Sequence, residues 1–225
     1  QGRERHGAER HEHEAHAAGV EALRRGEVAQ VVLAGGMATR FGGVVKAVLQ
    51  AVDGKSFLQV KLEQTVALER TLETSVPIAL MTSFATDQTI RSHVAELGLG
   101  QPSVFNQFVS LRLEPGGELF RDRAGEVSPY APGHGDLFHA IRTHGPLARF
   151  REEGVRVVTV SNVDNLGARV DPTVVGMHLL GGRPLLPVGA EGAPCGLGQV
   201  ERFDGEIPHR GTAGLRSQLL GAEYL

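Results

Sequence analysis

The sequence predicts an α/β fold with three layers, in which helices cover both faces of a mixed, mostly parallel sheet. Short apolar runs that end at glycine or polar residues, such as 28–34 and 155–160, have the composition of strands buried on both faces. Segments of helical period separate these runs along the chain. Ligands of such sheets bind beyond the carboxyl ends of the strands, and the glycine-rich and polar segments of this chain follow its predicted strands.

The strands and helices between residues 28 and 180 have local signals of their own. Ser56 and Gln59 form a capping box at a helix start, Gly98 stops a helix, and Asp171 followed by Pro172 opens another. The predicted strands are 28–34, 76–81, 104–110 and 155–160, with a short extended stretch at 47–52. The predicted helices are about 57–70, 86–97 and 137–150, and one that begins at 171. A glycine-rich, hairpin-like region around 115–118 and a loop at 128–136 complete this part.

The two ends of the chain differ from this regular middle. Residues 1–27 are charged and rich in histidine, and we expect a polar leader that closes with a helix before the first strand. The spacing of its histidines completes no metal site. Residues 181–225 are dense in glycine and proline and hold no periodicity for long, so we expect a poorly ordered tail.

Composition excludes several classes of function. The 225 residues carry 23 basic and 26 acidic side chains, so the formal charge of −3 gives no global attraction to nucleic acid or to an anionic membrane. The single Cys195 excludes an internal disulfide framework and a cysteine-rich zinc site, in keeping with a reducing compartment. No apolar run approaches the ~20 residues that cross a bilayer, and the sequence shows no signal-peptide core. We therefore expect a cytoplasmic protein.

The stretch 31-VVLAGGMATRFGGVVKAV-48 is the most informative part of the sequence. After the apolar run, Gly35 and Gly36 let backbone N–H groups approach an anion without a Cβ in the way, and Arg40 and Lys46 add positive charge. The phosphates of a nucleotide suit such a loop. The spacing fits neither a Walker loop nor the dinucleotide fingerprint. An ordinary strand-to-helix turn with exposed basic residues is the competing interpretation.

Within this stretch, 33-LAGGMATRFGGVVKA-47 resembles the signature loop of sugar-phosphate nucleotidyltransferases, in which an arginine and a later lysine hold the triphosphate. Taken alone, it also resembles molybdenum-cofactor guanylyltransferases. Three further segments, 80-LMTSFATD-87, 131-APGHGD-136 and 160-VSNVDNLGA-168, separate the two. Together and in this order, they are similar to the UDP-glucose pyrophosphorylase family (UTP–glucose-1-phosphate uridylyltransferase). The resemblance implies a Rossmann-like, GT-A-like nucleotidyltransferase domain over residues 28–180.

The resemblance assigns the residues around the base. Gln107 offers an amide donor and an acceptor, which suit the edge of a uracil ring, and a surface amide is the structural alternative. Gly133, beside His134, lets the backbone lie against a base or ribose. The alternative interpretation of His134 is a loop histidine whose hydrogen bonds are satisfied within the protein. Met81 is expected to help wall the base pocket, with core packing as its competitor.

The resemblance also assigns the residues around the phosphates. Arg40 and Lys46 are the expected catalytic cations. Asp164 is the expected ligand of Mg²⁺, the implied cofactor, because this ion takes oxygen ligands and bridges phosphates. An aspartate that caps the next turn is the alternative. The remaining expected substrate-binding residues are Leu33, Gly35, Gly36 and Asn162.

The implied reaction is uridylyl transfer, in which the phosphate of glucose 1-phosphate attacks UTP to give UDP-glucose and pyrophosphate. Galactose or N-acetylglucosamine 1-phosphate remains open as the substrate, and the oligomeric state is not indicated. Members of the family continue well past this length, so the fold is expected to be incomplete at its C-terminus and to lack much of the sugar half. A nucleotide-binding fragment or regulatory relative without turnover is the alternative function.

Overall fold

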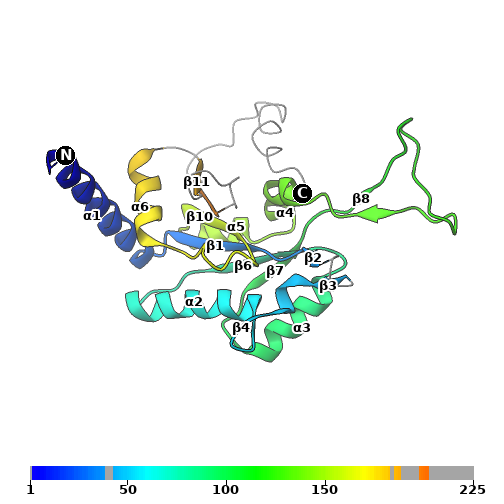
Figure 1. Ribbon diagram of the computed structural model, residues 1–225, viewed down its shortest axis with the longest axis horizontal. Helices are drawn as coiled ribbons and strands as arrows, with labels where there is room; N and C mark the ends of the chain where they lie inside the picture. Colours follow the sequence, from blue (N-terminus) through cyan, green and yellow to red (C-terminus); the bar gives the residue numbers. More distant parts are fainter. Residues whose placement is uncertain (1, 39–42, 183–184, 189–197, 203–225) are drawn as a thin grey trace.

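The computed structural model describes residues 2–38, 43–182, 185–188 and 198–202, which form an α/β fold around one six-stranded sheet (Figure 1). The strands lie in the order β11-β12-β10-β1-β6-β7. Their bounds are β1 Val28–Leu33, β6 Ile78–Thr82, β7 Ser103–Asn106, β10 Val157–Asn162, β11 Leu185–Val188 and β12 Gly198–Arg202. The pairs β10-β1, β1-β6 and β6-β7 are parallel, whereas β12 pairs antiparallel with β10 and β11. The predicted mixed, mostly parallel sheet is confirmed.

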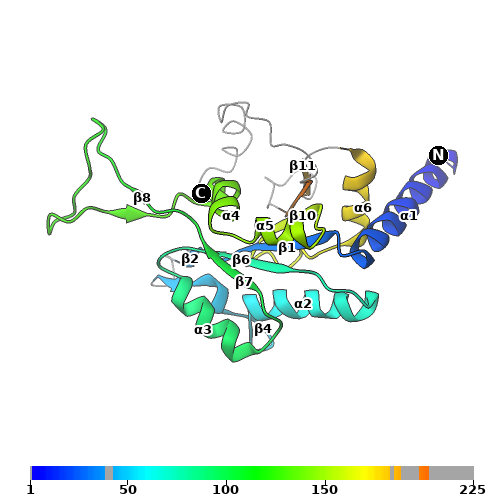
Figure 2. The same ribbon diagram turned by 180° about the vertical axis from the view of Figure 1, so that it is seen from behind.

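Helices cover both faces of this sheet, as Figures 1 and 2 show. The helices α2 (Phe57–Leu72) and α3 (Asp87–Leu97) lie on one face, and α4 (Leu137–Thr143) and α5 (Leu147–Glu152) lie on the other. Every residue of β1 is buried, as expected of a strand covered on both sides. Successive residues of β1 therefore serve two cores. Val32 packs in the cluster that contains Leu62 of α2, and Val31 in the cluster that contains Ile141 of α4.

The first helix, α1 (Gly2–Arg24), crosses α6 (Pro172–Gly181) at close range. A Cβ on Gly19 would lie 1.7 Å from the Pro172 carbonyl oxygen, and one on Gly176 would lie 1.6 Å from that of Ala15, so only glycine fits at either contact. The leader over residues 1–27 is thus almost wholly helical, and its buried Ala15 packs against another helix. The Asp171 carboxylate caps α6 as predicted, accepting hydrogen bonds from the Thr173 and Val174 amides.

Two predicted elements end earlier than expected. The helix predicted over 137–150 is broken between α4 and α5 at Pro146, which has no N–H to donate and disfavours the helical conformation of the residue before it. The strand predicted over 104–110 ends at Asn106. The Gln107 amide still donates to the Thr82 carbonyl of β6 at 2.9 Å, and the chain then leaves the sheet. Gln107 therefore lies in a loop at the carboxyl end of the strand.

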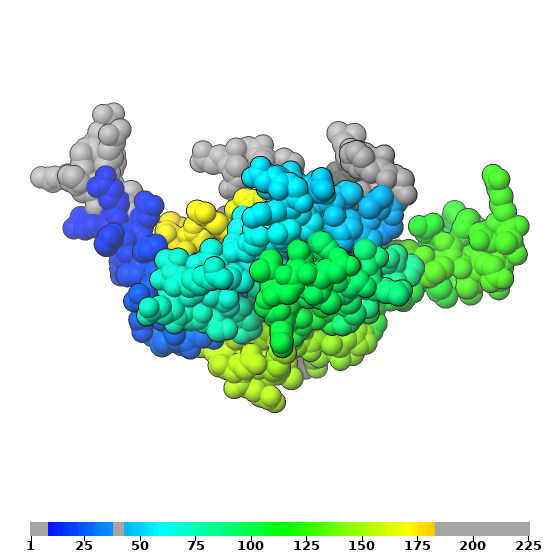
Figure 3. Space-filling view, turned by 90° about the horizontal axis from the view of Figure 1, so that it is seen from below, coloured from blue at the N-terminus to red at the C-terminus, as the bar shows by residue number. Residues whose placement is uncertain are grey.

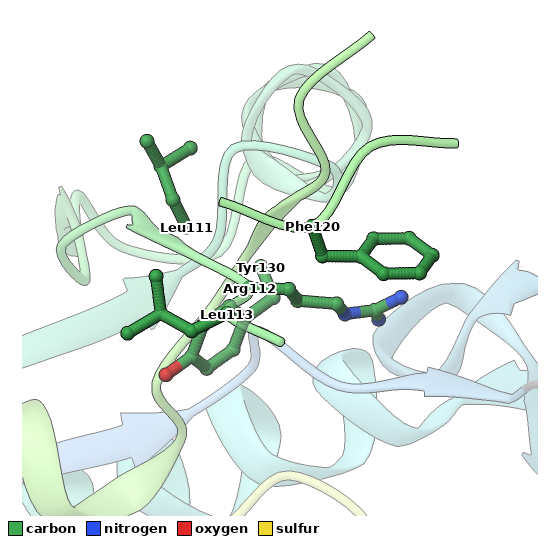
Figure 4. Close-up of a pocket in the computed structure, with 5 residues that line it drawn as sticks. All are labelled: Leu111, Arg112, Leu113, Phe120 and Tyr130. Atoms are coloured by element: carbon green, nitrogen blue, oxygen red, sulfur yellow. The ribbon is translucent and has the colours of Figure 1, made fainter. Parts of the chain in front are cut away.

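The chain between β7 and α4 forms an arm that projects from the body of the molecule, seen at one side in Figure 3. The arm is an antiparallel ribbon in which β8 (Ser110–Leu111) pairs with β9 (Pro129–Tyr130), so the predicted hairpin is larger than 115–118. An open hollow of about 500 Å³ lies on this ribbon (Figure 4). Its lining residues are Leu111, Arg112, Leu113, Phe120 and Tyr130. None of the predicted site residues lines it.

Shorter elements connect the main ones. They are β2 Met37–Ala38, β3 Val44–Val45, η2 Lys46–Val48, β4 Gln50–Val52, β5 Lys55–Ser56 and η3 His134–Asp136. The stretch predicted as extended over 47–52 is thus part 3₁₀ turn and part strand. Asp53 and Gly54 both have positive φ, the geometry of a tight hairpin turn between β4 and β5.

Two segments of residues 181–225, for which we expected a poorly ordered tail, form the strands β11 and β12, which extend the sheet beside β10. The flank of β10 away from β1 is therefore covered by β12. The rest of this expected tail beyond Gly182 lies outside the described residues. No helix in the described ranges is long and apolar enough to cross a membrane.

Candidate functional site

The glycine loop after β1 lies where β1 and β6 end together. The Ala34 amide donates to the Met81 carbonyl at 2.8 Å, and the Ser83 hydroxyl donates to the Gly35 carbonyl at 3.1 Å. A Cβ on Gly35 would lie 2.6 Å from Nε2 of Gln107, so the close approach of this side chain requires glycine at position 35. Gly36 is exposed, and its carbonyl accepts from the Lys46 amide at 3.2 Å. Arg40, the other expected cation, lies outside the described residues.

Lys46 and Asp164 meet beside this loop, although 118 residues separate them in the sequence. Leu33 and Asn162 are partners in the parallel register of β1 and β10, which brings the segments after these strands together. The Lys46 Nζ lies 3.0 Å from Oδ2 of Asp164, and 42% and 36% of the two side chains remain exposed. An ion pair this open to water contributes little to stability, so its place at the loop is not explained by folding.

His134 lies near the same two charges, at the start of η3. Although much of His134 is exposed, the chain around its imidazole removes enough water to lower its pKa below the ordinary value of 6.5. The carboxylate of Asp164 acts in the opposite direction and Lys46 in the same direction as this desolvation. Three of the residues expected at the site, His134, Lys46 and Asp164, thus lie near one another.

Gln107 joins the glycine loop to the loop before η3. Its Oε1 accepts from the Gly133 amide at 3.0 Å, while its Nε2 packs against Gly35. The residue is buried, and its backbone amide is held by the end of β6. Gln107 is therefore no simple surface amide: its carbonyl oxygen links two loops, and its amide nitrogen lies at the glycine loop.

Three of the predicted site residues have side-chain atoms that are buried beneath the site. Leu33 and Met81 lie in the hydrophobic core on the α4 side of the sheet, which matches the packing alternative for Met81. Asn162 ends β10, and its Oδ1 is buried without a hydrogen-bond partner among the described residues. A buried acceptor that is left unpaired is costly, so this atom marks a place where a donor or cation would be accommodated.

The residues present fit a magnesium ion that takes one ligand from the protein and its other ligands from nucleotide phosphates and water. No group of three or more histidine, cysteine, aspartate or glutamate side chains within the described ranges could enclose a metal. Mg²⁺ bound to phosphates needs only one or two protein carboxylates and keeps several waters. The carboxylate of Asp164, partly exposed just after the carboxyl end of β10, could serve as such a ligand.

Lys61 is a charged residue of this region that the sequence analysis did not single out. It lies on α2 and is 1% exposed, and its Nζ donates to the Ser161 hydroxyl at 3.2 Å. Burial lowers its pKa from 10.5 to about 8, and the charge of Asp164 acts against this decrease. The helical spacing could have indicated that Lys61 is buried, because positions 58, 61, 62 and 65 form the buried face of this helix.

Comparisons with known proteins give the family of the chain. Residues 8–184 match the family described as UTP--glucose-1-phosphate uridylyltransferase. A Saccharomyces cerevisiae UTP--glucose-1-phosphate uridylyltransferase is 33% identical over 157 residues, which cover 64% of this chain and 30% of the yeast protein. A probable UDP-N-acetylglucosamine pyrophosphorylase from Caenorhabditis elegans is 33% identical over 181 residues, covering 72% of this chain and 37% of that protein. The chain thus spans about a third of the length of these relatives.

Solved structures show the same fold. The uridine diphosphate N-acetylglucosamine pyrophosphorylase from Trypanosoma brucei aligns with a TM-score of 0.71 at 22% identity, over 80% of this chain and 40% of that one. A mutant UDP-glucose pyrophosphorylase from Leishmania major, in complex with UDP-glucose, aligns with a TM-score of 0.63 at 25% identity. That alignment covers 75% of this chain and 36% of the Leishmania chain.

Proposed function

Because the chain belongs to the UTP--glucose-1-phosphate uridylyltransferase family, we propose that it carries the nucleotide half-site of a UDP-sugar pyrophosphorylase. In this reaction an oxygen of a sugar 1-phosphate forms a bond to the α-phosphorus of UTP, and the bond to the departing pyrophosphate breaks. One observation carries the proposal. Lys46 and Asp164 meet at 3.0 Å beside a glycine loop, at the carboxyl ends of two adjacent parallel strands.

The phosphates are the part of UTP that this arrangement suits. The exposed backbone at Gly36 lets a phosphate oxygen approach main-chain amides, and Lys46 can exchange its carboxylate partner for a phosphate oxygen. Both groups are held before the substrate arrives, so they act by position and charge and need no covalent intermediate. We assign Arg40 to the same task on the family resemblance alone.

Asp164 is the residue that would hold Mg²⁺. When bound, the ion would neutralise negative charge on the phosphate oxygens. The contribution of the chain is to hold the Asp164 carboxylate at the phosphate side of the loop, where it faces Lys46. The unpaired Oδ1 of Asn162 lies two residues away in the chain and supports the same assignment.

The base of the nucleotide is assigned to the side of the loop where Gln107 lies. Its Oε1 is engaged by the Gly133 amide, so we assign its Nε2 to a uracil carbonyl. Gln107→Glu removes this donor and should reduce the preference for UTP over CTP and ATP. Calorimetric titration with the three nucleotides measures the change. An equal loss for all three would show that Gln107 acts only as a link between loops.

Glucose 1-phosphate is the proposed second substrate, and the description of the matched family supports it. N-acetylglucosamine 1-phosphate is the competing substrate, because a relative of similar identity is described as a pyrophosphorylase for that sugar. Parallel assays with the two sugar phosphates, each with UTP, decide between them. The preferred sugar is the one with the higher kcat/KM.

Two measurements on the purified chain test the whole proposal. Isothermal calorimetry with UTP and Mg²⁺ reports binding, and a pyrophosphate-release assay with the sugar phosphates reports turnover. Binding together with turnover supports the enzyme, whereas binding without turnover supports the alternative of a nucleotide-binding module. Absence of both, in a folded chain, would contradict the proposed half-site.

A further inference from the structure

Lys61 and Gln64 tie the helix α2 to the loop that follows β10. The Lys61 Nζ donates to the Ala168 carbonyl at 2.5 Å in addition to the Ser161 hydroxyl, and the Gln64 Nε2 donates to the Leu166 carbonyl at 3.0 Å. The two side chains are three residues apart and so project from the same side of the helix. The chain is thereby fastened to α2 at Ser161, before the loop segment 163–168, and at Leu166 and Ala168 within it. In Figure 1, α2 lies on the same face of the sheet as α3.

This loop carries Asp164, whose carboxylate faces Lys46 at the candidate site. Other contacts also hold this loop: Val163 is buried in the core cluster that contains Leu62 of α2, and the Asn165 amide donates to the Asn162 carbonyl at 3.2 Å. The Val163 amide donates to the Leu33 carbonyl at 3.1 Å, and the Ala168 amide bonds within the loop itself. The tethers from α2 therefore hold the part of the loop that follows Asp164, and the contacts of Val163 hold the part before it.

A lysine is a costly choice for a tether that meets only neutral groups. Lys61 is almost fully buried and forms no ion pair with a carboxylate among the described residues. Burying a cation without such a partner is strongly unfavourable, and a neutral donor could satisfy a hydroxyl and a carbonyl at lower cost. The charge of Asp164 acts on Lys61 and favours its protonated form. The positive charge of Lys61 thus acts electrostatically on the loop that carries Asp164.

We propose that Lys61 is a positioning residue of the phosphate site, which fixes the Asp164 loop through Ser161 and Ala168 and supplies a buried positive charge behind it. Gln64 is the neutral second tether of the same loop. The inference rests on the proposed function in one respect, namely that this loop faces the phosphates of UTP. The tethering itself is independent of any ligand.

The first experiment measures the loop without nucleotide. Hydrogen exchange of peptides that cover residues 163–168 is compared between the unchanged chain and Lys61→Met, which keeps the length of the side chain but removes charge and donors. We expect at least tenfold faster exchange in this segment. Lys55→Met is the matched control, because Lys55 is a partly exposed lysine next to α2 that pairs with Glu63 and does not contact the loop. Its exchange should match that of the unchanged chain.

The second experiment measures UTP affinity of the same proteins by calorimetry. Lys61→Met should bind UTP at least tenfold more weakly, and Lys61→Arg, which keeps charge and donors, should recover most of that loss. Lys55→Met should bind as the unchanged chain does. Rescue by arginine is a result that a purely structural role of the aliphatic chain would not produce.

The outcomes separate this inference from the proposed function. If the unchanged chain does not bind UTP, the proposed half-site fails, and unaltered exchange in Lys61→Met would overturn the tether as well. Faster exchange with unchanged UTP affinity, or an equal loss in the methionine and arginine variants, would overturn the positioning role. If Lys61→Met does not fold, Gln64→Met takes its place, with an expected increase of about threefold in the exchange of residues 163–168. No increase would contradict the tether.

Discussion

The candidate site has two sides that are built in different ways. The neutral side consists of Gly35, Ser83, Gln107 and Gly133, which fit together by close contact and by hydrogen bonds between uncharged groups. The charged side consists of Lys46, Lys61 and Asp164, of which only Lys61 is buried. Shape limits the neutral side, so it should respond to added volume. Charge organises the other side, so it should respond to pH, to salt and to loss of a cation.

The largest expected effect belongs to the buried cation of the charged side. In the folded chain Lys61 has a pKa of about 8, below its ordinary value of 10.5, so between these pH values the unfolded chain binds a proton that the folded chain does not. The free energy of unfolding therefore increases as pH rises through this window, by about 1.4 kcal/mol per pH unit. Below pH 8 this contribution is absent, since both states are protonated.

Urea unfolding of the unchanged chain and of Lys61→Met, at pH 7 and at pH 10, isolates this effect. The difference in unfolding free energy between the two proteins should change by about 2 to 3 kcal/mol in favour of the unchanged chain at the higher pH. Lys55→Met, in which an exposed cation is lost, should show no comparable change. A pH-independent difference would mean that Lys61 titrates as an ordinary lysine.

The next effect concerns the exposed cation. Lys46→Ala should weaken UTP binding by about 1.5 to 3 kcal/mol, because it removes a charge-assisted contact to the phosphates. Calorimetry at low and at physiological salt measures it, and the loss should be smaller at the higher ionic strength. Lys55→Ala is the matched loss of one surface charge. Unchanged UTP affinity in a folded Lys46→Ala protein would remove Lys46 from the site.

The neutral side gives a test of volume. Gly35→Ala places a Cβ where Nε2 of Gln107 lies, 2.6 Å away, and should destabilise the fold by about 1 to 3 kcal/mol and weaken UTP binding. Gly116→Ala, on the arm, has no atom within 4 Å of the added Cβ and serves as the control. Thermal unfolding compares the two variants. Equal stability would show that the Gln107 side chain moves away at no cost, and that the neutral side is not limited by shape.

The difference between the two sides also explains what could be predicted from the sequence. Buried apolar runs separated by helical patterns predict a mostly parallel sheet with its ligand site at the carboxyl ends of the strands, so Lys46 and Asp164 could be expected at the same edge. The structure adds that β1 and β10 are neighbours in this sheet. The family expected from the four motif segments is also confirmed, because residues 8–184 match its model. Local signals located the helix starts at Ser56 and Asp171, where both side chains cap as expected.

Other features depend on contacts between distant parts of the chain, which no local pattern specifies. The link from Gln107 to Gly133 and the crowding at Gly35 arise because three loops meet in space. Lys61 stands among apolar positions of a helix, where a lysine is usually interpreted as a solvated side chain; only the fold shows that its end reaches the Ala168 carbonyl. The strand β12 obtains its place from pairing with β10, and β11 from pairing with β12, although their glycine- and proline-rich surroundings suggest no strand.

The smallest expected effect is the most discriminating one for the charged side. A double-mutant cycle of Lys46→Ala and Asp164→Ala measures how strongly the ion pair itself stabilises the folded chain. Since both side chains are more than a third exposed, the coupling energy in urea unfolding should not exceed about 1 kcal/mol, and salt should reduce it. The same two substitutions should nevertheless impair UTP binding in the presence of Mg²⁺. A small coupling energy with a large loss of UTP binding means that the two charges contribute little to folding and are available to a ligand. A coupling energy above about 2 kcal/mol would instead make the pair a structural contact, and would remove the main observation on which the nucleotide half-site rests.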